Sequence, residues 1–251
     1  MSDLSWLTAM PVAHRGLHDS EDGRIENSLS SVRAALDQGF AIEVDLQLAG
    51  DAVPVVFHDT RLDRLTDNAG PVAERTARDL ARIRLTGSDD TIPSLTDLLD
   101  LVDGASPLFL ELKPHGPRNE ALAQSVSDVL RTYPGPAALM SFDPDLVATI
   151  GRLMPDATKG IVADATQEPV LWGGLTTMER FGLRHLLHMP RTRPDFIAYD
   201  CRALPAPGPF LWRLLRGMPI LTWTVRSALE RDRVARWSNQ IIFEGFDPHA
   251  R

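Results

Sequence analysis

The sequence predicts an α/β protein built as a (β/α)₈ TIM barrel, and two observations lead to this fold class. Short apolar runs alternate with amphipathic segments along the whole 251-residue chain, which is typical of a parallel sheet with helices outside it. Nine runs are candidate strands, and one link between them is too short for a parallel crossover. The expected strands are residues 11–15, 40–48, 53–58, 107–113, 137–142, 158–163, 195–200, 219–225 and 240–244.

The short link decides how many strands the barrel has. Only Ala-Gly-Asp-Ala, residues 49–52, joins the second run to the third, whereas a parallel crossover needs about a dozen residues. Residues 53–58 should therefore turn back beside 40–48 as a short hairpin strand, which leaves eight strands for a closed barrel. A doubly wound open sheet is the alternative. The passage from 60 to 106 contains helical patterns of its own, so we expect residues 1–251 to form a single domain.

Capping residues mark where several helices begin. A serine or aspartate side chain accepts hydrogen bonds from the free N–H groups of a first helical turn. Ser28, Ser94, Asp143 and Ser227 each precede an amphipathic segment, and Gly39 follows the first of these segments. We expect the first helix to run to residue 38 and the last to run to residue 237.

Composition narrows the class of protein. The formal net charge of −8 argues against a nucleic-acid binder that neutralises phosphates. Cys201 is the single cysteine, so it forms no intrachain disulfide, and we expect it to be buried and unreactive. The N-terminal segment lacks the pattern of a signal peptide, and no run of eighteen apolar residues predicts a membrane span. A cytoplasmic protein is expected, and the sequence does not indicate an oligomeric state.

Acidic residues gather near the ends of expected strands. Residues two apart in a strand face the same side, so Glu43 and Asp45 project together, and Glu111 comes late in a later strand. Barrel enzymes carry their active sites at the C-terminal ends of the strands. Three converging carboxylates would raise one another's pKa unless a cation lies among them. Because every donor is oxygen, we expect Ca²⁺ or Mg²⁺ rather than zinc.

The other residues at these strand ends suit a phosphodiester. Three carboxylates, one divalent cation, Arg15 and Lys113 carry a summed charge of about +1, which matches a singly charged diester. Arg15 can donate a planar fork to phosphate oxygens, and Lys113 offers a point charge. His14 and His58 can move protons near neutral pH. Trp223 is expected to form part of the substrate wall at the rim.

Seven short segments follow one another in a specific order. They are His14-Arg15-Gly16, Glu26-Asn27-Ser28, Ile42-Glu43-Val44-Asp45, Pro54-Val55-Val56-Phe57-His58-Asp59, Leu110-Glu111-Leu112-Lys113, Ser141-Phe142-Asp143 and Trp223-Thr224-Val225. Together they resemble the glycerophosphodiester phosphodiesterase family over nearly the whole chain. The resemblance implies a TIM barrel, here without a large inserted cap domain. It also implies hydrolysis of glycerophosphodiesters to glycerol 3-phosphate and an alcohol, with a divalent cation.

The resemblance also implies a role for individual residues. The implied roles are metal binding by Glu43, Asp45 and Glu111, acid and base catalysis by His14 and His58, and phosphate contact by Arg15 and Lys113. The family usually ends its last strand with Thr-Asp before a proline, whereas this chain has Glu244 in a longer segment. His115, just beyond the last implied phosphate contact, is a further candidate for the rim.

Some functions and residues are left open by the sequence. Lysophospholipase D-type hydrolysis of lipid phosphodiesters would use the same site with a more apolar rim, and a catalytically silent module would bind the diester without cleaving it. Glu26 and Asn27 could cap the following helix or belong to the site. Asp59 could orient the histidine before it or end its strand. His18 follows the first strand closely and could lie near the site, but a surface loop is the preferred expectation. Arg226 is expected on a charged helix face.

Overall fold

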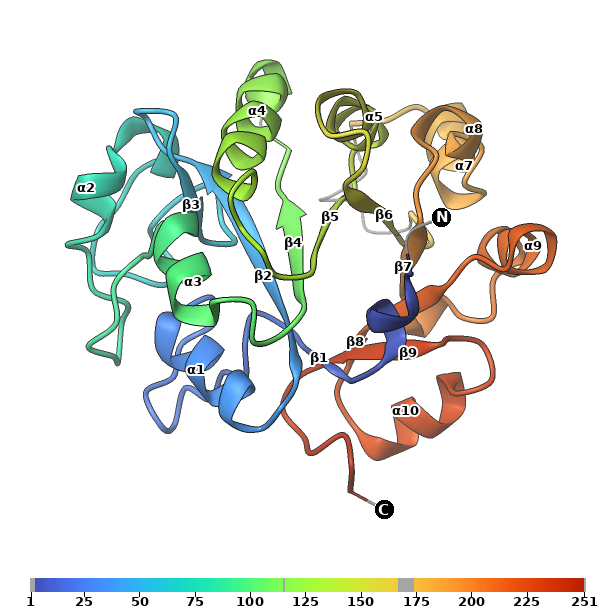
Figure 1. Ribbon diagram of the computed structural model, residues 1–251, viewed down its shortest axis with the longest axis horizontal. Coiled ribbons are helices and arrows are strands. Elements are labelled where there is room, and N and C mark those ends of the chain that lie inside the picture. Colours follow the sequence, from blue (N-terminus) through green and yellow to red (C-terminus); the bar gives the residue numbers. More distant parts are fainter. Residues whose placement is uncertain (1–2, 115, 167–173, 251) are drawn as a thin grey trace.

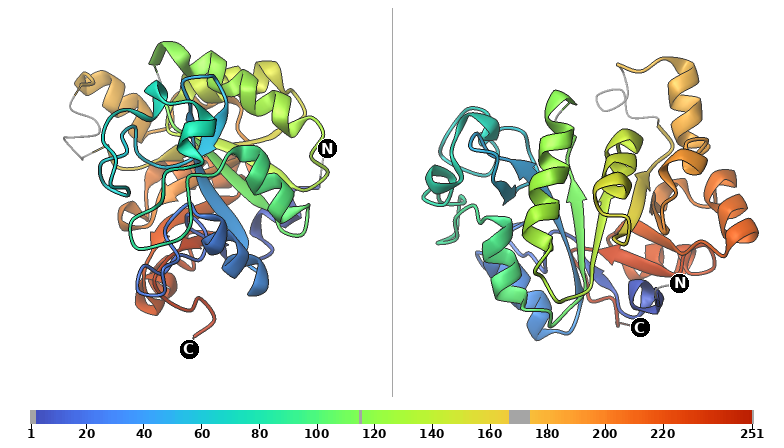
Figure 2. Two further views of the ribbon diagram at one scale, coloured as in Figure 1. Left: turned by 90° about the vertical axis from the view of Figure 1, so that its left-hand side faces the viewer. Right: turned by 45° about the horizontal axis from the view of Figure 1, so that its top comes forward.

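The closed barrel expected from the sequence is confirmed. The computed structural model describes residues 3–114, 116–166 and 174–250. Strand β1 (Val12–Ala13) pairs in parallel with both β2 (Ala41–Leu48) and β9 (Gln240–Phe243), so the sheet closes on itself. The helices lie outside the strands (Figure 1), and two further views show the same arrangement (Figure 2).

The other strands follow the expected order around the barrel. They are β3 (Pro54–Val56), β4 (Leu108–Leu112), β5 (Ala137–Ser141), β6 (Thr158–Ala163), β7 (Phe196–Asp200) and β8 (Ile220–Val225). From β4 to β9 each strand pairs in parallel with the next, and β4 also pairs with β2. Strand β3 runs antiparallel to β2, with Val55 opposite Gln47. The predicted hairpin is therefore confirmed, and it lies outside the eight strands of the barrel.

Helices connect the strands, and the predicted caps are present. The α-helices are α1 (Leu29–Asp37), α2 (Ala77–Leu80), α3 (Leu95–Val102), α4 (Asn119–Leu130), α5 (Pro144–Leu153), α7 (Thr177–Arg184), α8 (Met189–Thr192), α9 (Pro207–Arg216) and α10 (Ala228–Val234). Short 3-10 helices are η1 (Ser5–Thr8), η2 (Val72–Glu74), η3 (Gly116–Arg118) and η4 (Cys201–Ala203). Ser28, Ser94, Asp143 and Ser227 each accept a hydrogen bond from a first-turn N–H group. The last helix ends at Val234, three residues earlier than expected.

Alternation along β2 sorts its side chains between the two faces of the barrel wall. Ile42 and Val44 pack in the same core as the apolar residues of α1, α3 and α4. Ala41 packs instead with Phe109 and Phe196 from other strands, inside the barrel. Because side chains alternate along a strand, residues 43, 45 and 47 share the inner face with Ala41. The inner face is therefore apolar near the amino ends of the strands and polar toward their carboxyl ends.

Aromatic packing forms the floor beneath that polar layer. Phe109 meets Phe196 edge-on at 5.8 Å between ring centroids, and Trp6 approaches Phe109 at 5.9 Å. Leu7 of η1 is fully buried in the same cluster. Removing a buried phenylalanine ring costs about 3–5 kcal/mol, so Phe109→Ala would weaken the support of the polar layer.

The chain between β3 and α3 packs outside the barrel. Its apolar residues form a separate small core with Val55 of β3, made from residues such as Phe57, Leu62, Val72 and Leu80. This segment contains only η2 and α2 as regular helices. Across the described ranges, no helix has the length and apolar character needed to cross a bilayer.

Candidate active site

Three carboxylates meet on the inner face of the barrel, on the neighbouring strands β2 and β4. Glu43 and Asp45 lie two apart on β2, and Glu111 is the register partner of Asp45 on the neighbouring β4. All three are buried, and one carboxylate oxygen from each lies within 4.8 Å of the others. The structure therefore brings together the three residues that the sequence predicts as metal ligands. This cluster is called the carboxylate cage below.

Two cations partly neutralise the carboxylate cage. The Nζ atom of Lys113 lies 2.7 Å from Asp45 and 2.5 Å from Glu111, and Nε of Arg15 lies 3.1 Å from Asp45. Burial alone would raise the pKa of Asp45, but Lys113 and then Arg15 outweigh it and hold that pKa far below its usual range. The same ion pairs outweigh burial at Lys113 and raise the pKa of its ammonium group.

Glu43 is the carboxylate that these cations leave least compensated. Its Oε2 atom accepts a hydrogen bond of 2.9 Å from the backbone N–H of Arg15, while its buried Oε1 has no hydrogen-bond partner among the described residues. Burial, followed by the charges of Asp45 and Glu111, raises the pKa of Glu43 well above its usual value. An unpaired buried carboxylate oxygen beside two other carboxylates fits a hard divalent cation, which takes oxygen ligands.

The loop before α1 supports the carboxylate cage. The side chain of Asn27 donates to Asp45 Oδ2 at 2.9 Å and accepts from the backbone N–H of Asp45 at 3.0 Å. Glu26 accepts a hydrogen bond of 2.7 Å from Arg15 and pairs with Arg64 at 2.8 Å. The helix cap is Ser28, so the structure resolves the open choice by placing Glu26 and Asn27 at the site.

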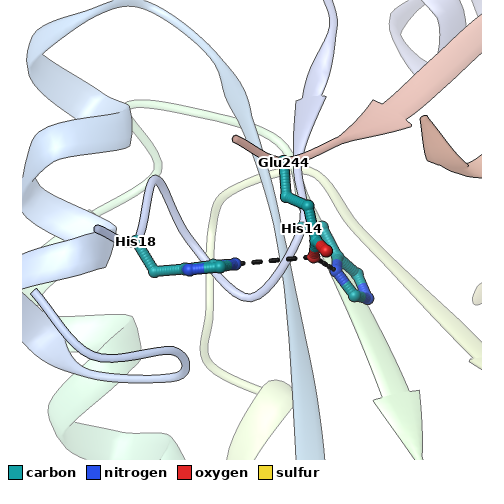
Figure 3. Close-up of side chains that lie close together, drawn as sticks. All are labelled: His14, His18 and Glu244. Atoms are coloured by element: carbon teal, nitrogen blue, oxygen red, sulfur yellow. Dashed lines mark hydrogen bonds and ion pairs between the residues drawn. The ribbon is translucent and has the colours of Figure 1, made fainter. Parts of the chain in front are cut away.

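His14, just after β1, links the carboxylate cage to the last strand. Its Nδ1 lies 2.5 Å from Oε2 of Glu244 (Figure 3). Its Nε2 lies 3.9 Å from Oε2 of Glu43. Burial lowers the pKa of His14, and the hydrogen bond with Glu244 opposes part of that effect. An ionised carboxylate can only accept, so Nδ1 carries the proton and Nε2 of the neutral ring is free to accept one.

Glu244 has two further neighbours, His18 and Arg226. Nε2 of His18 lies 3.5 Å from Oε2 of Glu244, and Nε of Arg226 donates to its Oε1 at 2.7 Å. The hydrogen bond from His14, and then the nearby His18, outweigh burial and lower the pKa of Glu244 strongly. His18 lies in the loop after β1, as expected, and this loop reaches Glu244. The prediction of a helix face for Arg226 is wrong, because α10 begins at Ala228 and Arg226 comes directly after β8.

His58 follows β3 and has a carboxylate partner of its own. Its Nδ1 lies 2.6 Å from Asp59 Oδ1, and Asp59 Oδ2 accepts 2.6 Å from Nε of Arg64. Gln47, on the inner face of β2, donates to the carbonyl oxygen of His58 at 2.7 Å. Asp59 thus orients His58, which settles the second open choice. The spacing of two from Asp45 could have indicated Gln47, whereas nothing local indicated Arg64.

These groups open into one cleft of about 1110 Å³. Both histidines and the cations of the carboxylate cage line it, as do Phe142, Trp223, Leu175 and Leu183 on other parts of the rim. The Trp223 ring meets Phe142 edge-on at 5.3 Å, and its Nε1 donates to the carbonyl of Ala198 at 3.1 Å. The cleft therefore combines a charged wall with an apolar wall.

Asp143 and Cys201 have the structural roles that the sequence predicts, although Asp143 also lines the cleft. Asp143 accepts from the backbone N–H of Asp145 and caps α5, as expected. Cys201 is buried, also as expected, and burial raises the pKa of its thiol. His115 lies outside the described residues.

Comparison with known proteins gives a consistent result. The profile of the glycerophosphoryl diester phosphodiesterase family matches residues 14–176. Glycerophosphodiester phosphodiesterase 1 of Homo sapiens is 28% identical over 148 residues, which cover 54% of this chain and 43% of the human protein. The match thus spans less than half of that relative. A glycerophosphodiester phosphodiesterase of Bacillus altitudinis is 28% identical over 173 residues, which cover 64% of this chain and 69% of the relative.

Solved structures share the fold over almost the full chain. A phosphodiesterase of Oleispira antarctica, in complex with the product sn-glycerol-3-phosphate, superposes with a TM-score of 0.76 at 23% identity, covering 95% of this chain and 93% of that one. The glycerophosphodiester phosphodiesterase of Thermotoga maritima gives a TM-score of 0.72 at 21% identity, with 93% and 94% covered. At these identities the likeness establishes the barrel fold.

Proposed function

Because the chain belongs to the glycerophosphoryl diester phosphodiesterase family, we propose that it hydrolyses glycerophosphodiesters to glycerol 3-phosphate and an alcohol with a divalent cation. One observation carries the proposal. His14 and His58 each have a carboxylate partner and lie at the carboxylate cage: His14 is next to Glu43, and His58 lines the same cleft as Glu43 and Glu111. We further propose that residues 1–251 act as one domain, because the first and last strands close the same barrel.

Glu43, Asp45 and Glu111 are the proposed ligands of the cation. When bound there, Ca²⁺ or Mg²⁺ would withdraw negative charge from a phosphate oxygen. Lys113 uses two of its three donors on Asp45 and Glu111, which leaves one for the substrate. Arg15, whose Nη1 is bound to Glu26, keeps its Nη2 group for the same purpose. These two cations bind and orient the phosphate in this proposal.

The two histidines have complementary proton-transfer roles. His14 is neutral by burial and accepts at Nε2 the proton of the attacking oxygen, which forms a new bond to phosphorus. The bond from phosphorus to the alcohol oxygen breaks, and His58 donates the proton that this alkoxide needs. The attacking oxygen belongs to water or to the neighbouring hydroxyl of the glycerol moiety, in which case a cyclic phosphate forms first.

A second candidate function is hydrolysis of lipid-bearing diesters such as lysophospholipids. The apolar wall formed by Phe142, Trp223, Leu175 and Leu183 supports it, since an acyl chain needs apolar surface that choline or glycerol does not. Both candidates use the same carboxylate cage and the same histidines. Their substrates differ only in the acyl chain that a lysophospholipid carries on its glycerol moiety.

The test measures release of glycerol 3-phosphate from a panel of glycerophosphodiesters. In parallel it measures release of choline and lysophosphatidic acid from lysophosphatidylcholine. We expect turnover of at least one soluble diester, loss of turnover with chelator, and recovery when Ca²⁺ or Mg²⁺ is added back. Faster release of choline from lysophosphatidylcholine than from glycerophosphocholine would favour the second candidate. Binding of diesters without turnover under any metal would instead favour a silent binding module and contradict the proposed catalysis.

A further inference from the structure

Helix α9 carries an apolar face that points into solvent. Phe210, Leu211, Leu214 and Leu215 are 52%, 50%, 70% and 63% exposed. In a helix, residues 0, 1, 4 and 5 positions along lie on one side. Trp212 packs against the barrel core on the other side of the helix. A surface helix is usually polar on its solvent-facing side, whereas α9 is apolar there as well as at its contact with the barrel.

Helix α7, which contacts α9, also exposes apolar side chains. Met178 and Phe181 of α7 are 77% and 51% exposed, and the Phe181 ring lies 4.3 Å from the His185 ring. A Cβ atom on Gly208 of α9 would lie only 3.5 Å from the Cα of His185, so the two helices touch. Figures 1 and 2 show α7 and α9 on the same side of the barrel. We call these six exposed side chains of α7 and α9 the apolar face.

The apolar face adjoins the cleft. Leu175, Glu179 and Leu183, in or next to α7, line the cleft, while Met178 and Phe181 lie on the exposed surface of the same helix. One helix thus forms both part of the cleft wall and part of the apolar face. Large contiguous apolar patches on soluble proteins mark binding surfaces for proteins, ligands or membranes.

Charge distinguishes among those occupants. Helices α7 and α9 together contain four arginines and one acidic residue, a net charge of +3, whereas the whole chain carries −8. Arg213 and Arg236 border a small groove together with Phe210, and Arg216 at the end of α9 is exposed. In a symmetric dimer the same patch meets itself, which would place these positive helices against another copy of themselves. An anionic surface complements them instead.

We propose that the apolar face docks on the surface of a bilayer that contains anionic lipids. Interfacial helices of this kind insert an apolar face among the acyl chains and place arginines at the lipid head groups. Docking through α7 and α9 would bring the membrane next to the cleft wall that α7 forms. The inference does not depend on the proposed catalysis, because docking can be measured without turnover.

The test is co-sedimentation of the full chain with vesicles made of equal parts phosphatidylglycerol and phosphatidylcholine. We expect binding to these vesicles, weaker binding to phosphatidylcholine alone, and a decrease with added salt. Leu214→Ser/Leu215→Ser should weaken binding at least tenfold. The matched control is Leu229→Ser, which changes an 80% exposed leucine on α10 and should change binding less than twofold.

Circular dichroism and the melting temperature of each variant establish that it is folded. No binding to anionic vesicles by the folded wild-type chain would overturn the proposal. Equal binding by Leu214→Ser/Leu215→Ser would overturn it too, since another surface would then hold the membrane. Light scattering tests whether a second copy of the chain occupies the apolar face. If the wild type is a dimer and Leu214→Ser/Leu215→Ser is a monomer, a second copy covers this face and the proposal is overturned.

Discussion

The two histidines of the site use the same hydrogen-bond pattern at different depths. The His14 side chain is 14% exposed and lies 2.5 Å from Glu244, while that of His58 is 33% exposed and lies 2.6 Å from Asp59. Around His58 water can replace a lost partner and screen its charge, as at other exposed ion pairs. Around His14 it largely cannot, and buried polar networks depend on each member. The comparison teaches that equal distances do not imply equal dependence on the carboxylate partner.

The largest expected effect comes from removing either histidine. His14→Ala and His58→Ala should each lower kcat by about 10²–10⁴-fold, the usual contribution of a general acid or base. The measurement is the rate of glycerol 3-phosphate release at saturating substrate and cation. If the two proposed roles belong to a single reaction step, the double variant should be little worse than either single variant.

A binding measurement separates this loss from damage to the carboxylate cage. Neither histidine is a proposed cation ligand, so calorimetric affinity for Ca²⁺ or Mg²⁺ should stay within a few-fold of wild type. Full activity in either alanine variant would contradict two-histidine catalysis and would remove the basis for comparing His14 with His58.

The next largest effect concerns Glu43, the cage carboxylate nearest His14. Glu43→Gln keeps the size of the side chain and removes its charge, so cation affinity should fall about 100-fold or more. Replacing a residue that only hydrogen-bonds to a metal ligand typically costs about 10–100-fold. Titration of the cation by calorimetry measures the change. Glu26→Gln, which alters a carboxylate at the edge of the site that is not a proposed ligand, is the matched control and should change affinity less.

The same variant carries a pH signature in the cation-free protein. Burial and then Asp45 and Glu111 raise the pKa of Glu43 above its usual 4.5, so the folded state holds this proton more tightly than the unfolded chain. The stability it contributes is present below pH 4.5 and is lost as the pH rises through the folded pKa. With chelator present, the free energy of unfolding of Glu43→Gln should therefore increase relative to that of wild type as the pH rises. A constant difference would contradict this.

The sequence predicted those parts of the site that depend on local periodicity. Alternation in β2 placed Glu43 and Asp45 on one face, and the four-residue link before β3 distinguished the hairpin from a barrel strand. Local periodicity could not place Glu244 against His14, because these residues are 230 positions apart and meet only when β9 pairs with β1. Nor could it place Arg64, whose contacts with Asp59 and Glu26 depend on the path of an irregular segment.

The carboxylate partners give the sharpest test of the comparison, with intermediate effects. Glu244→Gln should lower kcat about 10–100-fold, whereas Asp59→Asn, at the more exposed pair, should lower it less than about 10-fold. Because Glu244 raises the pKa of the buried His14, its replacement should also move the acid limb of the kcat/KM profile to lower pH. A merely structural role would leave that limb in place. Equal losses in both variants would show that depth does not matter.

The smallest effect is expected at His18, which shares Glu244 with His14. Its Nε2 lies 3.5 Å from the carboxylate, compared with 2.5 Å for His14, and this longer distance makes it a weak competitor for the same oxygen. His18→Gln should therefore change kcat less than about threefold, since His14 and Arg226 still hold Glu244 in place. The kcat/KM profile against pH is the measurement, with Glu244→Gln as the reference. A loss as large as that of Glu244→Gln would mean that His18 controls the carboxylate, and that the buried pair is in fact a three-residue unit.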